Sequence, residues 1–341
     1  MRQNVNALFK IHFKESKGWT SEDRKVFYRF FMKFDKNPSE ITMRKFLFKS
    51  PAILFLLLMS CGGEWVSGNS STVSCDLSDI LFGTPKRMVL SGDGDFLYVL
   101  DRFDDVYAYS RNRARTCAFE PLRTSENPDA KIPVNMASEL AIAGSFLYYY
   151  DGISILRSGD ADWECDVSLN AFAATPSYLY YAPSVGLQKV KMNSTGCVPT
   201  GTSFSATRVL AVDEKSSSIA TAETSGALSD PPQRISVYDA DGNVRFRAAL
   251  ASGDSENSLH FCSATRIRLG AAFLALLDAK CGYLGVFNLS GGLEHRLKLS
   301  EIGVRNPVDM DIVDDDLYIL SSSSIEPLYF LDLASYAFGE E

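Results

Sequence analysis

Short runs of alternating or unbroken apolar residues recur along the chain from about residue 84 onwards. Two stretches show the pattern: RMVLSGDGDFLYVLDRFDDVYAYSRNRARTCAFEPL (87–122) and ELAIAGSFLYYYDGISILRSGDADWECDVSL (139–169). Each contains four runs rich in Val, Ile, Leu, Tyr and Phe, and Gly-Asp, Asp-Gly or Asn-rich turns separate the runs. This composition and this alternation predict short β-strands, four to a stretch.

The four-strand unit is repeated six times, at a spacing of roughly 40 residues. The units run 84–122, 133–169, 170–204, 205–251, 262–300 and 304–335. A four-stranded antiparallel unit repeated at this spacing is typical of a β-propeller blade. No helical period is found after Cys61. The sequence therefore predicts an all-β fold, a six-bladed β-propeller.

The sixth unit lacks a good fourth strand, because few residues follow PLYFLDLAS (327–335). An unassigned strand, SCDLSDILF (74–82), lies ahead of the first unit. We expect this N-terminal strand to complete the last blade, since closure removes an open sheet edge that would favour aggregation. The alternative is a loop at 74–82 and closure of the ring through 336–338.

Two units carry a family resemblance. PKRMVLSGDGDFLYVLDRFDDVYAYS (85–110) resembles the NHL repeat, in which a proline leads into the first strand, a Gly/Asp turn precedes a "YV.D" strand, and an aromatic-ended third strand follows. ISVYDADGNVRF (235–246) resembles the turn between the third and fourth strands of the same group. The resemblance implies a propeller that serves as a binding scaffold; a few propellers of this type are lyases or lactonases.

The stretch KFLFKSPAILFLLLMSCGG (45–63) has the order of a bacterial lipoprotein signal peptide. Basic residues precede the apolar run Ala52 to Met59, which is too short to span a bilayer and suits the apolar segment of a signal peptide. Leu58-Met59-Ser60-Cys61 resembles the lipobox, which implies cleavage before Cys61 and acylation of that cysteine. The alternative is a buried strand of a cytoplasmic protein.

The signal peptide divides the chain into segments. Counted from Met43 it has an ordinary length, so we interpret residues 1–42 as an upstream extension from a misassigned start; a real cytoplasmic amphipathic segment is the alternative. Residues 43–60 are then the signal peptide, and 61–73 are the acylated cysteine with a flexible tether rich in Gly and Ser. Residues 74–341 form one β-propeller domain.

Residues 61–341 contain 22 Lys and Arg against 37 Asp and Glu, a net charge of −15. Because no basic stripe could neutralise phosphates, we expect no nucleic acid partner. His260 and His295 are too few for a histidine metal site in the channel. The acidic stretches 91–95 and 239–243 lack the full calcium-loop pattern and are interpreted as turns. We predict no cofactor, metal or catalytic residue, and leave enzymatic activity open.

Six cysteines follow Cys61, an even number that permits disulfides in an exported chain. Cys262 and Cys281 flank the first two strands of the fifth unit, and we predict a disulfide between them. The other four are expected to begin the outer strands of their blades: Cys75, Cys117, Cys165 and Cys197. A bridge needs α-carbons within roughly 7 Å, so these four are free buried thiols if the outer strands stand too far apart.

The longer connections predict where recognition occurs. Strands of a propeller blade are lettered a to d from the axis outwards; the d–a and b–c connections emerge on one face, and the a–b and c–d connections on the other. All the long connections belong to the first class: 123–133, 223–233, 251–261 and 321–327. Elaborated loops on a rigid scaffold usually bind partners, so this loop-rich face is the predicted binding face. Drift in loop length is the alternative.

Charged residues are predicted around the channel mouth on the loop-rich face. The start of strand a and the end of strand b are neighbours, so we expect the pairs Arg87–Asp101, Arg208–Glu223 and Arg266–Asp278. Either the pairs only satisfy charges packed near the axis, or they form a polar socket for a small ligand or a partner's side chain. The predicted binding residues are Arg87, Asp101, Asn135, Asp151, Arg208, Glu223, Arg266, Asp278 and Asp309.

These features predict an exported lipoprotein, lipid-anchored to the bacterial cell envelope, whose propeller binds a protein or a small polar ligand through the loop-rich face. Gly62, directly after the lipidated cysteine, resembles a signal for the outer membrane. The first alternative is a propeller hydrolase or lyase that acts on a small polar substrate at the channel mouth. The second is a purely architectural subunit of an envelope complex.

Overall fold

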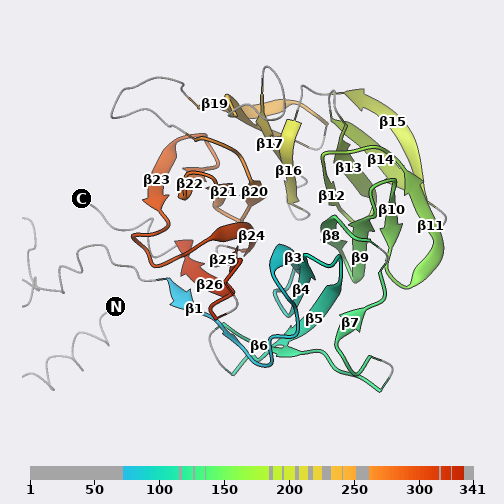
Figure 1. Ribbon diagram of the computed structural model, residues 1–341. Coiled ribbons are helices and arrows are strands. Elements are labelled where there is room, and N and C mark those ends of the chain that lie inside the picture. The colour runs from blue at the N-terminus through green and yellow to red at the C-terminus, as the bar shows by residue number, and fades with distance from the viewer. Residues whose placement is uncertain are drawn as a thin grey trace, which may run out of the picture. The chain divides into compact units, whose positions relative to one another are not determined.

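The structure is a computed structural model that describes residues 72–333, apart from 115–116, 126, 135, 184–186, 194–195, 204–206, 214–217, 225–231, 240, 251–260, 315 and 324. The strands form six antiparallel sheets arranged as blades in a ring, as Figure 1 shows. Strands β3, β8, β12, β16, β20 and β24 are innermost and surround a central channel. The predicted six-bladed β-propeller is therefore confirmed. No helix in the described part of the chain is long and apolar enough to cross a membrane.

Each blade has its strands in the order a to d from the axis outwards. Blade one comprises β3 (Pro85–Leu90), β4 (Phe96–Asp101), β5 (Val106–Arg111) and β6 (Ala118–Pro121). Blade two comprises β8 (Glu139–Ala143), β9 (Phe146–Tyr150), β10 (Ser154–Arg157) and β11 (Asp160–Asp166). Blade three comprises β12 (Ala171–Ala174), β13 (Tyr178–Ala182), β14 (Gln188–Met192) and β15 (Cys197–Ser203).

The second half of the ring repeats the arrangement. Blade four comprises β16 (Thr207–Asp213), β17 (Ser218–Glu223), β18 (Arg234–Tyr238) and β19 (Val244–Ala249). Blade five comprises β20 (Arg266–Leu269), β21 (Phe273–Asp278), β22 (Tyr283–Asn288) and β23 (Leu293–Lys298). Blade six comprises β24 (Pro307–Val313), β25 (Asp316–Ser321) and β26 (Leu328–Asp332), and its fourth strand is β1 (Val73–Ser74).

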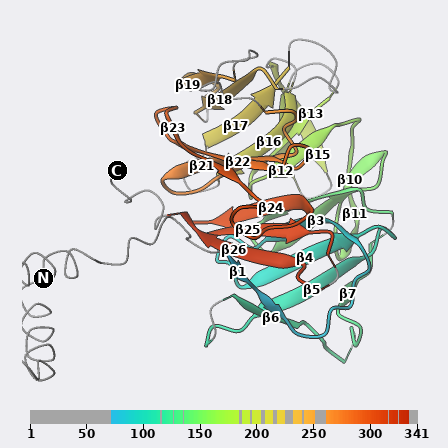
Figure 2. The ribbon, with the colours of Figure 1, turned by 60° about the vertical axis from the view of Figure 1, so that its left-hand side comes forward.

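The ring is closed by the N-terminal segment. Strand β1 pairs antiparallel with β26, Val73 opposite Phe330, and Figure 2 shows the two side by side. The chain then leaves blade six, and β2 (Asp76–Leu77) adds in parallel to β6 at the edge of blade one. The prediction that an N-terminal strand completes the last blade is confirmed. The rest of the predicted strand 74–82 contributes to blade one instead, so one short segment joins two blades.

The hydrophobic core lies between the blades. Among the described residues six buried clusters are found, and each is shared by one pair of neighbouring blades. The cluster between blades six and one contains Cys75, Leu77 and Phe82 of the N-terminal segment together with residues such as Leu97 and Tyr318. Because strand pairs within one blade bury only part of their apolar surface, a blade depends on both neighbours for its core. The closing segment therefore completes a core as well as a sheet.

Three disulfides are present, and one is the predicted pair Cys262–Cys281. Cys75–Cys117 ties the closing segment to blade one, and Cys165–Cys197 ties blade two to blade three, with α-carbons 4.9 Å and 5.3 Å apart. The expectation of free thiols at these four positions is wrong. Both bonds are possible because the edges concerned lie close together. Strand β2 pairs with β6 at the edge of blade one, and Glu164 and Gly196 form a parallel bridge between blades two and three. Cys165 lies near the end of its outer strand, not at the start.

Part of the long connections is described. The end of the connection 123–133 forms a short strand, β7 (Lys131–Ile132). It pairs with β5, with Ile132 opposite Val106. Much of the connections 223–233 and 251–261 lies outside the described residues.

Candidate functional site in the central channel

Four charged side chains, each from the strand a of a different blade, meet inside the channel. Asp309 of β24 accepts a hydrogen bond from Arg266 Nε of β20, at 2.7 Å. Arg266 Nη2 also pairs with Glu139 of β8, and Glu139 Oε1 accepts a hydrogen bond from Arg87 Nε of β3, at 2.9 Å. The four groups form a continuous ion-pair ladder, Asp309–Arg266–Glu139–Arg87. We call it the ionic ladder.

The ionic ladder crosses the channel. Arg266 belongs to blade five and Glu139 to blade two, which are opposite each other in a ring of six blades. Their ion pair therefore passes across the axis. The side chains of Asp309, Arg266 and Glu139 are 0%, 9% and 14% exposed, so the charges are held largely away from water. A buried charge is tolerated only when it is paired and hydrogen-bonded, as these are.

The electrostatics of the ladder favour the charged form of Arg266. Burial by itself lowers the pKa of this guanidinium, but the carboxylates of Asp309 and Glu139 outweigh the effect and raise the pKa above its ordinary value. Arg266 therefore remains a cation at neutral pH. One planar guanidinium with separate donors can hold two carboxylates at once, which a lysine ammonium does less well.

A second charged layer repeats the first, two residues further along the same strands. Asp311 Oδ1 accepts a hydrogen bond from Arg268 Nε at 2.7 Å, and its Oδ2 accepts one from the backbone N–H of Leu90 at 2.7 Å. In the first layer Asp309 Oδ2 likewise accepts from the N–H of Met88, at 2.9 Å. Each aspartate of β24 therefore links an arginine of blade five to the backbone of blade one. The two layers connect the closing blade to both neighbours.

An open cavity of about 660 Å³ lies beyond the ionic ladder. Its walls are the later halves of the six strands a, and its mouth is formed by a–b turns such as those at Gly92, Gly144 and Asp314. The cavity therefore opens on the face of the a–b turns, opposite the loop-rich face. Each of the four inner strands that carry a ladder residue places it one or two positions before the first residue that lines the cavity, so the ladder lies at the inner end.

The predicted pairs Arg87–Asp101 and Arg266–Asp278 are wrong. Arg87 lies opposite Leu100, after a register shift that follows Pro85, and Arg266 lies opposite Leu277. The aspartates one residue further on point to their own turns. Asp101 accepts hydrogen bonds from the N–H groups of Gly83, Phe103 and Asp105, and Asp278 accepts from those of Cys262 and Cys281.

Asp151 has the same role in blade two, where its Oδ1 accepts hydrogen bonds at 2.8 Å from the N–H groups of Ile153 and Ser154. The acidic residue that ends strand b in blades one, two and five therefore organises the b–c turn. Aspartate commonly bonds the backbone two residues on in this way. Asp101, Asp151 and Asp278 are not brought together in the channel.

Of the remaining predicted residues, Glu223 bonds within its own blade, and the side chains of the other two are not described. Glu223 accepts hydrogen bonds from Arg234 Nε at 3.1 Å, Tyr238 at 2.9 Å and Thr221 at 3.1 Å, within blade four. The side chain of Arg208 and all of Asn135 lie outside the described residues. The structure thus brings together three of the predicted residues: Arg87, Arg266 and Asp309.

The sequence reasoning missed Glu139, Arg268 and Asp311. A signal for the last two was present, because residues two apart on a strand share a face and the stretches RIR (266–268) and DMD (309–311) place like charges two apart. Glu139 had no comparable signal. Its partners Arg87 and Arg266 are 52 and 127 residues away, and the pairing depends on the closed ring.

Among the described residues, one group of donors converges closely enough to hold a metal ion: Cys262, Asp278 and Cys281, within 4.8 Å of one another. The two sulfurs are joined in a disulfide and so are not thiolates, the form in which cysteine binds metal. Asp278 is already bonded to two backbone N–H groups. We interpret this group as structural.

The six antiparallel blades around a central channel define the class of protein, a six-bladed β-propeller. No protein-family model matches the sequence, and no curated protein matches it either. Solved β-propellers resemble the structure. Kluyveromyces marxianus Hsv2 is 13% identical, with 73% of this chain and 97% of that chain covered and a TM-score of 0.47.

Two further structures are similar to the same degree. The β-propeller domain of Myceliophthora thermophila Cps50 (Swd1) is 11% identical, with 77% of this chain and 98% of that chain covered and a TM-score of 0.46. Kuenenia stuttgartiensis hydrazine synthase is 14% identical, with 76% and 80% covered and a TM-score of 0.47. At these identities the likeness concerns the fold alone.

Proposed function

We propose that the chain is an exported lipoprotein, anchored to the cell envelope through Cys61, whose NHL-like propeller binds a protein partner on its loop-rich face. The signal-like stretch 45–63 supports export. Three disulfides agree with it, because disulfides persist mainly outside the cytoplasm. The tether composition of residues 61–73 supports a domain held flexibly at the membrane surface.

The observation that carries the binding proposal is the position of the most exposed apolar side chains. Among the described residues, four large apolar side chains are more than 60% exposed: Phe103, Met136, Ile153 and Ile325. Phe103, Ile153 and Ile325 lie in the b–c connections of blades one, two and six, and Met136 lies in the d–a connection from blade one to blade two. All four belong to the loop-rich face and to three consecutive blades. We call them the apolar tips.

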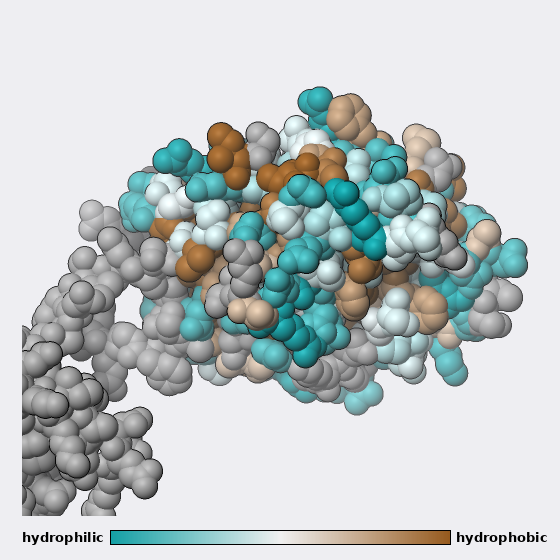
Figure 3. Space-filling model, turned by 90° about the horizontal axis from the view of Figure 1, so that it is seen from below, coloured by the Kyte–Doolittle hydropathy of each residue, from teal (hydrophilic) through white to brown (hydrophobic). Residues whose placement is uncertain are grey.

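The surroundings of the apolar tips favour a protein partner. Beside Phe103, Asp104 pairs with Lys86 and Asp105 pairs with Lys131, each at 2.6 Å. Paired charges around apolar side chains resemble the polar rim and apolar centre of a protein interface. They do not provide the unpaired positive charge that attracts nucleic acid or anionic lipid. In Figure 3, seen from below, apolar side chains stand out in small groups on a mostly hydrophilic surface.

Replacing three apolar tips by serine should strongly weaken partner binding while the propeller remains folded. Each buried apolar anchor of an interface commonly contributes 1–2 kcal/mol or more, so Phe103→Ser, Ile153→Ser and Ile325→Ser together should weaken binding about 100-fold or more. A photo-crosslinking residue placed at Phe103 or Ile325 in living cells should yield a discrete crosslinked partner, which can then be titrated against the purified variants.

The matched control uses three exposed apolar residues of the opposite face, Phe146→Ser, Val244→Ser and Leu289→Ser. This triple variant should bind the partner as the wild type does. Equal loss of binding in both variants, or crosslinks at Leu289 but not at Phe103, would assign the interface elsewhere.

Lipidation at Cys61 is tested separately. Cells fed an alkyne analogue of palmitate should label the wild-type protein and not the Cys61→Ser variant, because the thiol is the acylated group. Expression from Met43 should give the same mature N-terminus, at Cys61, as expression from Met1, when both are measured by mass spectrometry. Equal labelling of both proteins, or a mature chain that retains residues upstream of Cys61, contradicts the assignment.

A further inference from the structure

We propose that the axial cavity on the face of the a–b turns is a binding site for a small molecule with an apolar body and a single cationic group. This site is on the opposite face from the apolar tips, so it is independent of the protein interface proposed above. A propeller of this kind would carry two recognition surfaces, one at each end of its axis.

The size and the walls of the cavity suit a small organic ligand. Its volume of about 660 Å³ lies within the range of roughly 300–1,000 Å³ that is typical of small-molecule sites. Most of its lining is aliphatic or aromatic, and includes Leu140, Ile142, Phe172, Leu210 and Val313. The wall is built by six strands whose backbones are held in sheets, so the cavity is preformed and a ligand would not have to order it.

The inner end of the cavity is set by the ionic ladder. The pair Arg266–Glu139 joins opposite blades and therefore obstructs passage along the axis. A ligand that enters from the a–b turns would have its apolar part against the strands and its polar part near the mouth. The ion pair therefore separates the cavity from the channel mouth on the loop-rich face.

The charges that line the cavity are mostly acidic. They are Asp213, Asp311 and Asp314 against Arg268, and Arg268 is already bonded to Asp311 at 2.7 Å. Of the two other aspartates, Asp213 is the last residue of β16 and Asp314 directly follows β24, so both lie at the mouth. Acidic groups at the mouth of an apolar cavity focus a negative potential there and favour a cation.

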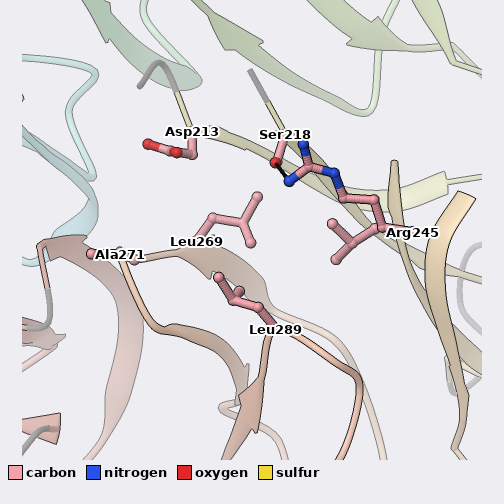
Figure 4. Close-up of a pocket in the computed structure, with 8 residues that line it drawn as sticks. Asp213, Ser218, Arg245, Leu269, Ala271 and Leu289 are labelled. Atoms are coloured by element: carbon pink, nitrogen blue, oxygen red, sulfur yellow. Dashed lines mark hydrogen bonds between the residues drawn. The ribbon is translucent and has the colours of Figure 1, made fainter. Parts of the chain in front are cut away.

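A smaller hollow of about 70 Å³ adjoins the mouth between blades four and five and shares Asp213, Leu269 and Ala271 with the main cavity. Figure 4 shows Asp213 on one side of this hollow and Arg245 with Ser218 on the other, and Leu269 and Leu289 complete it. Arg245 Nη1 donates a hydrogen bond to Ser218 Oγ at 2.8 Å. The guanidinium of Arg245 is thus directed to Ser218, and Asp213 remains on the side of the main cavity.

The proposal can be tested with three probes of one shape: 4-phenylbutylamine, 4-phenylbutanol and 4-phenylbutyrate, which carry a cationic, a neutral and an anionic end. Calorimetry or ligand-observed NMR on the mature propeller should find that the amine binds about tenfold more tightly than the alcohol. The carboxylate should bind more weakly than the alcohol, because its charge meets the acidic mouth.

Three variants locate the site. Asp213→Asn and Asp314→Asn should each weaken the amine about threefold and leave the alcohol unchanged, so that the two together account for the tenfold preference; Asp314 has φ of 54°, a conformation that asparagine tolerates well. Gly92→Trp should abolish binding of amine and alcohol alike, because Gly92 lines the cavity and an added β-carbon there meets nothing within 4 Å.

The control is Asp162→Asn, an exposed aspartate near the start of β11 that does not line the cavity, and it should bind the amine normally. Thermal unfolding of each variant shows whether it is folded. Equal affinity for amine and carboxylate, or amine binding that survives in folded Gly92→Trp, would overturn the proposal. Neither result bears on the apolar tips, whose test uses a different face.

Discussion

Replacing Arg266 by methionine should lower the free energy of unfolding by about 3–5 kcal/mol, the cost of leaving a buried charge without its partner. Asp309 is fully buried and pairs with Arg266, and the same guanidinium holds Glu139 across the channel. Methionine fills a similar volume but leaves the carboxylate of Asp309 with backbone donors alone, the N–H groups of Met88 and Met310. Chemical denaturation of the wild type and the variant measures the difference.

Two further variants separate charge from packing. Arg266→Met combined with Asp309→Asn removes both charges and should recover much of the loss, because no uncompensated carboxylate is left at that position. Arg266→Lys should be intermediate, since one ammonium cannot reproduce the two separate donors that meet Asp309 and Glu139.

The control for Arg266 is Arg113→Met. Arg113 forms an ion pair with Asp95, but its side chain is 71% exposed, so water replaces the lost contact and the unfolding midpoint should not move. If Arg266→Met is as mild as Arg113→Met, the ionic ladder does not hold the ring together.

The sequence predicted the fold well because the evidence for it is local. The inner strands of each blade are short and apolar, and a turn ends each of them. The segments FLYVLD and FLALLD are examples, and the structure has them as the strands Phe96–Asp101 and Phe273–Asp278. The disulfide Cys262–Cys281 was predictable for the same reason, since both residues belong to one blade. Outer strands were placed less well, because they are more exposed, as β11 shows with only two of its seven residues buried.

The candidate site could not be predicted to the same extent, because its contacts join different blades. Whether Arg87 meets Asp101 or Glu139 depends on a one-residue register shift in β3 and on the neighbouring blade. The pair Arg266–Glu139 requires the ring to be closed and to contain an even number of blades, so that two blades face each other. The face on which the cavity opens likewise depends on which layer of the inner strands carries the charges. These are properties of the assembled ring.

The closing segment is the second place where a single change should have a large effect. Strand β1 has two residues, and its hydrogen bonds to β26 are continued by Cys75 N–H to the carbonyl of Leu328, at 2.8 Å. The disulfide Cys75–Cys117 then fixes this segment to blade one. Replacing both cysteines by alanine should lower the free energy of unfolding by about 4 kcal/mol, because the bond spans 42 residues and the constraint on the unfolded chain grows with loop length.

The position of the Cys75–Cys117 bond adds an effect that loop length alone does not produce. Without it, β1 and β2 should detach before the rest of the ring, so amide hydrogen exchange should accelerate at β1, β2 and β26 and much less in blade three. The control is removal of Cys262–Cys281, which spans 19 residues inside blade five; it should cost about 3 kcal/mol and leave exchange at β1 and β26 unchanged. Uniform acceleration around the ring in the first variant would mean that the N-terminal segment does not act as a separate clasp.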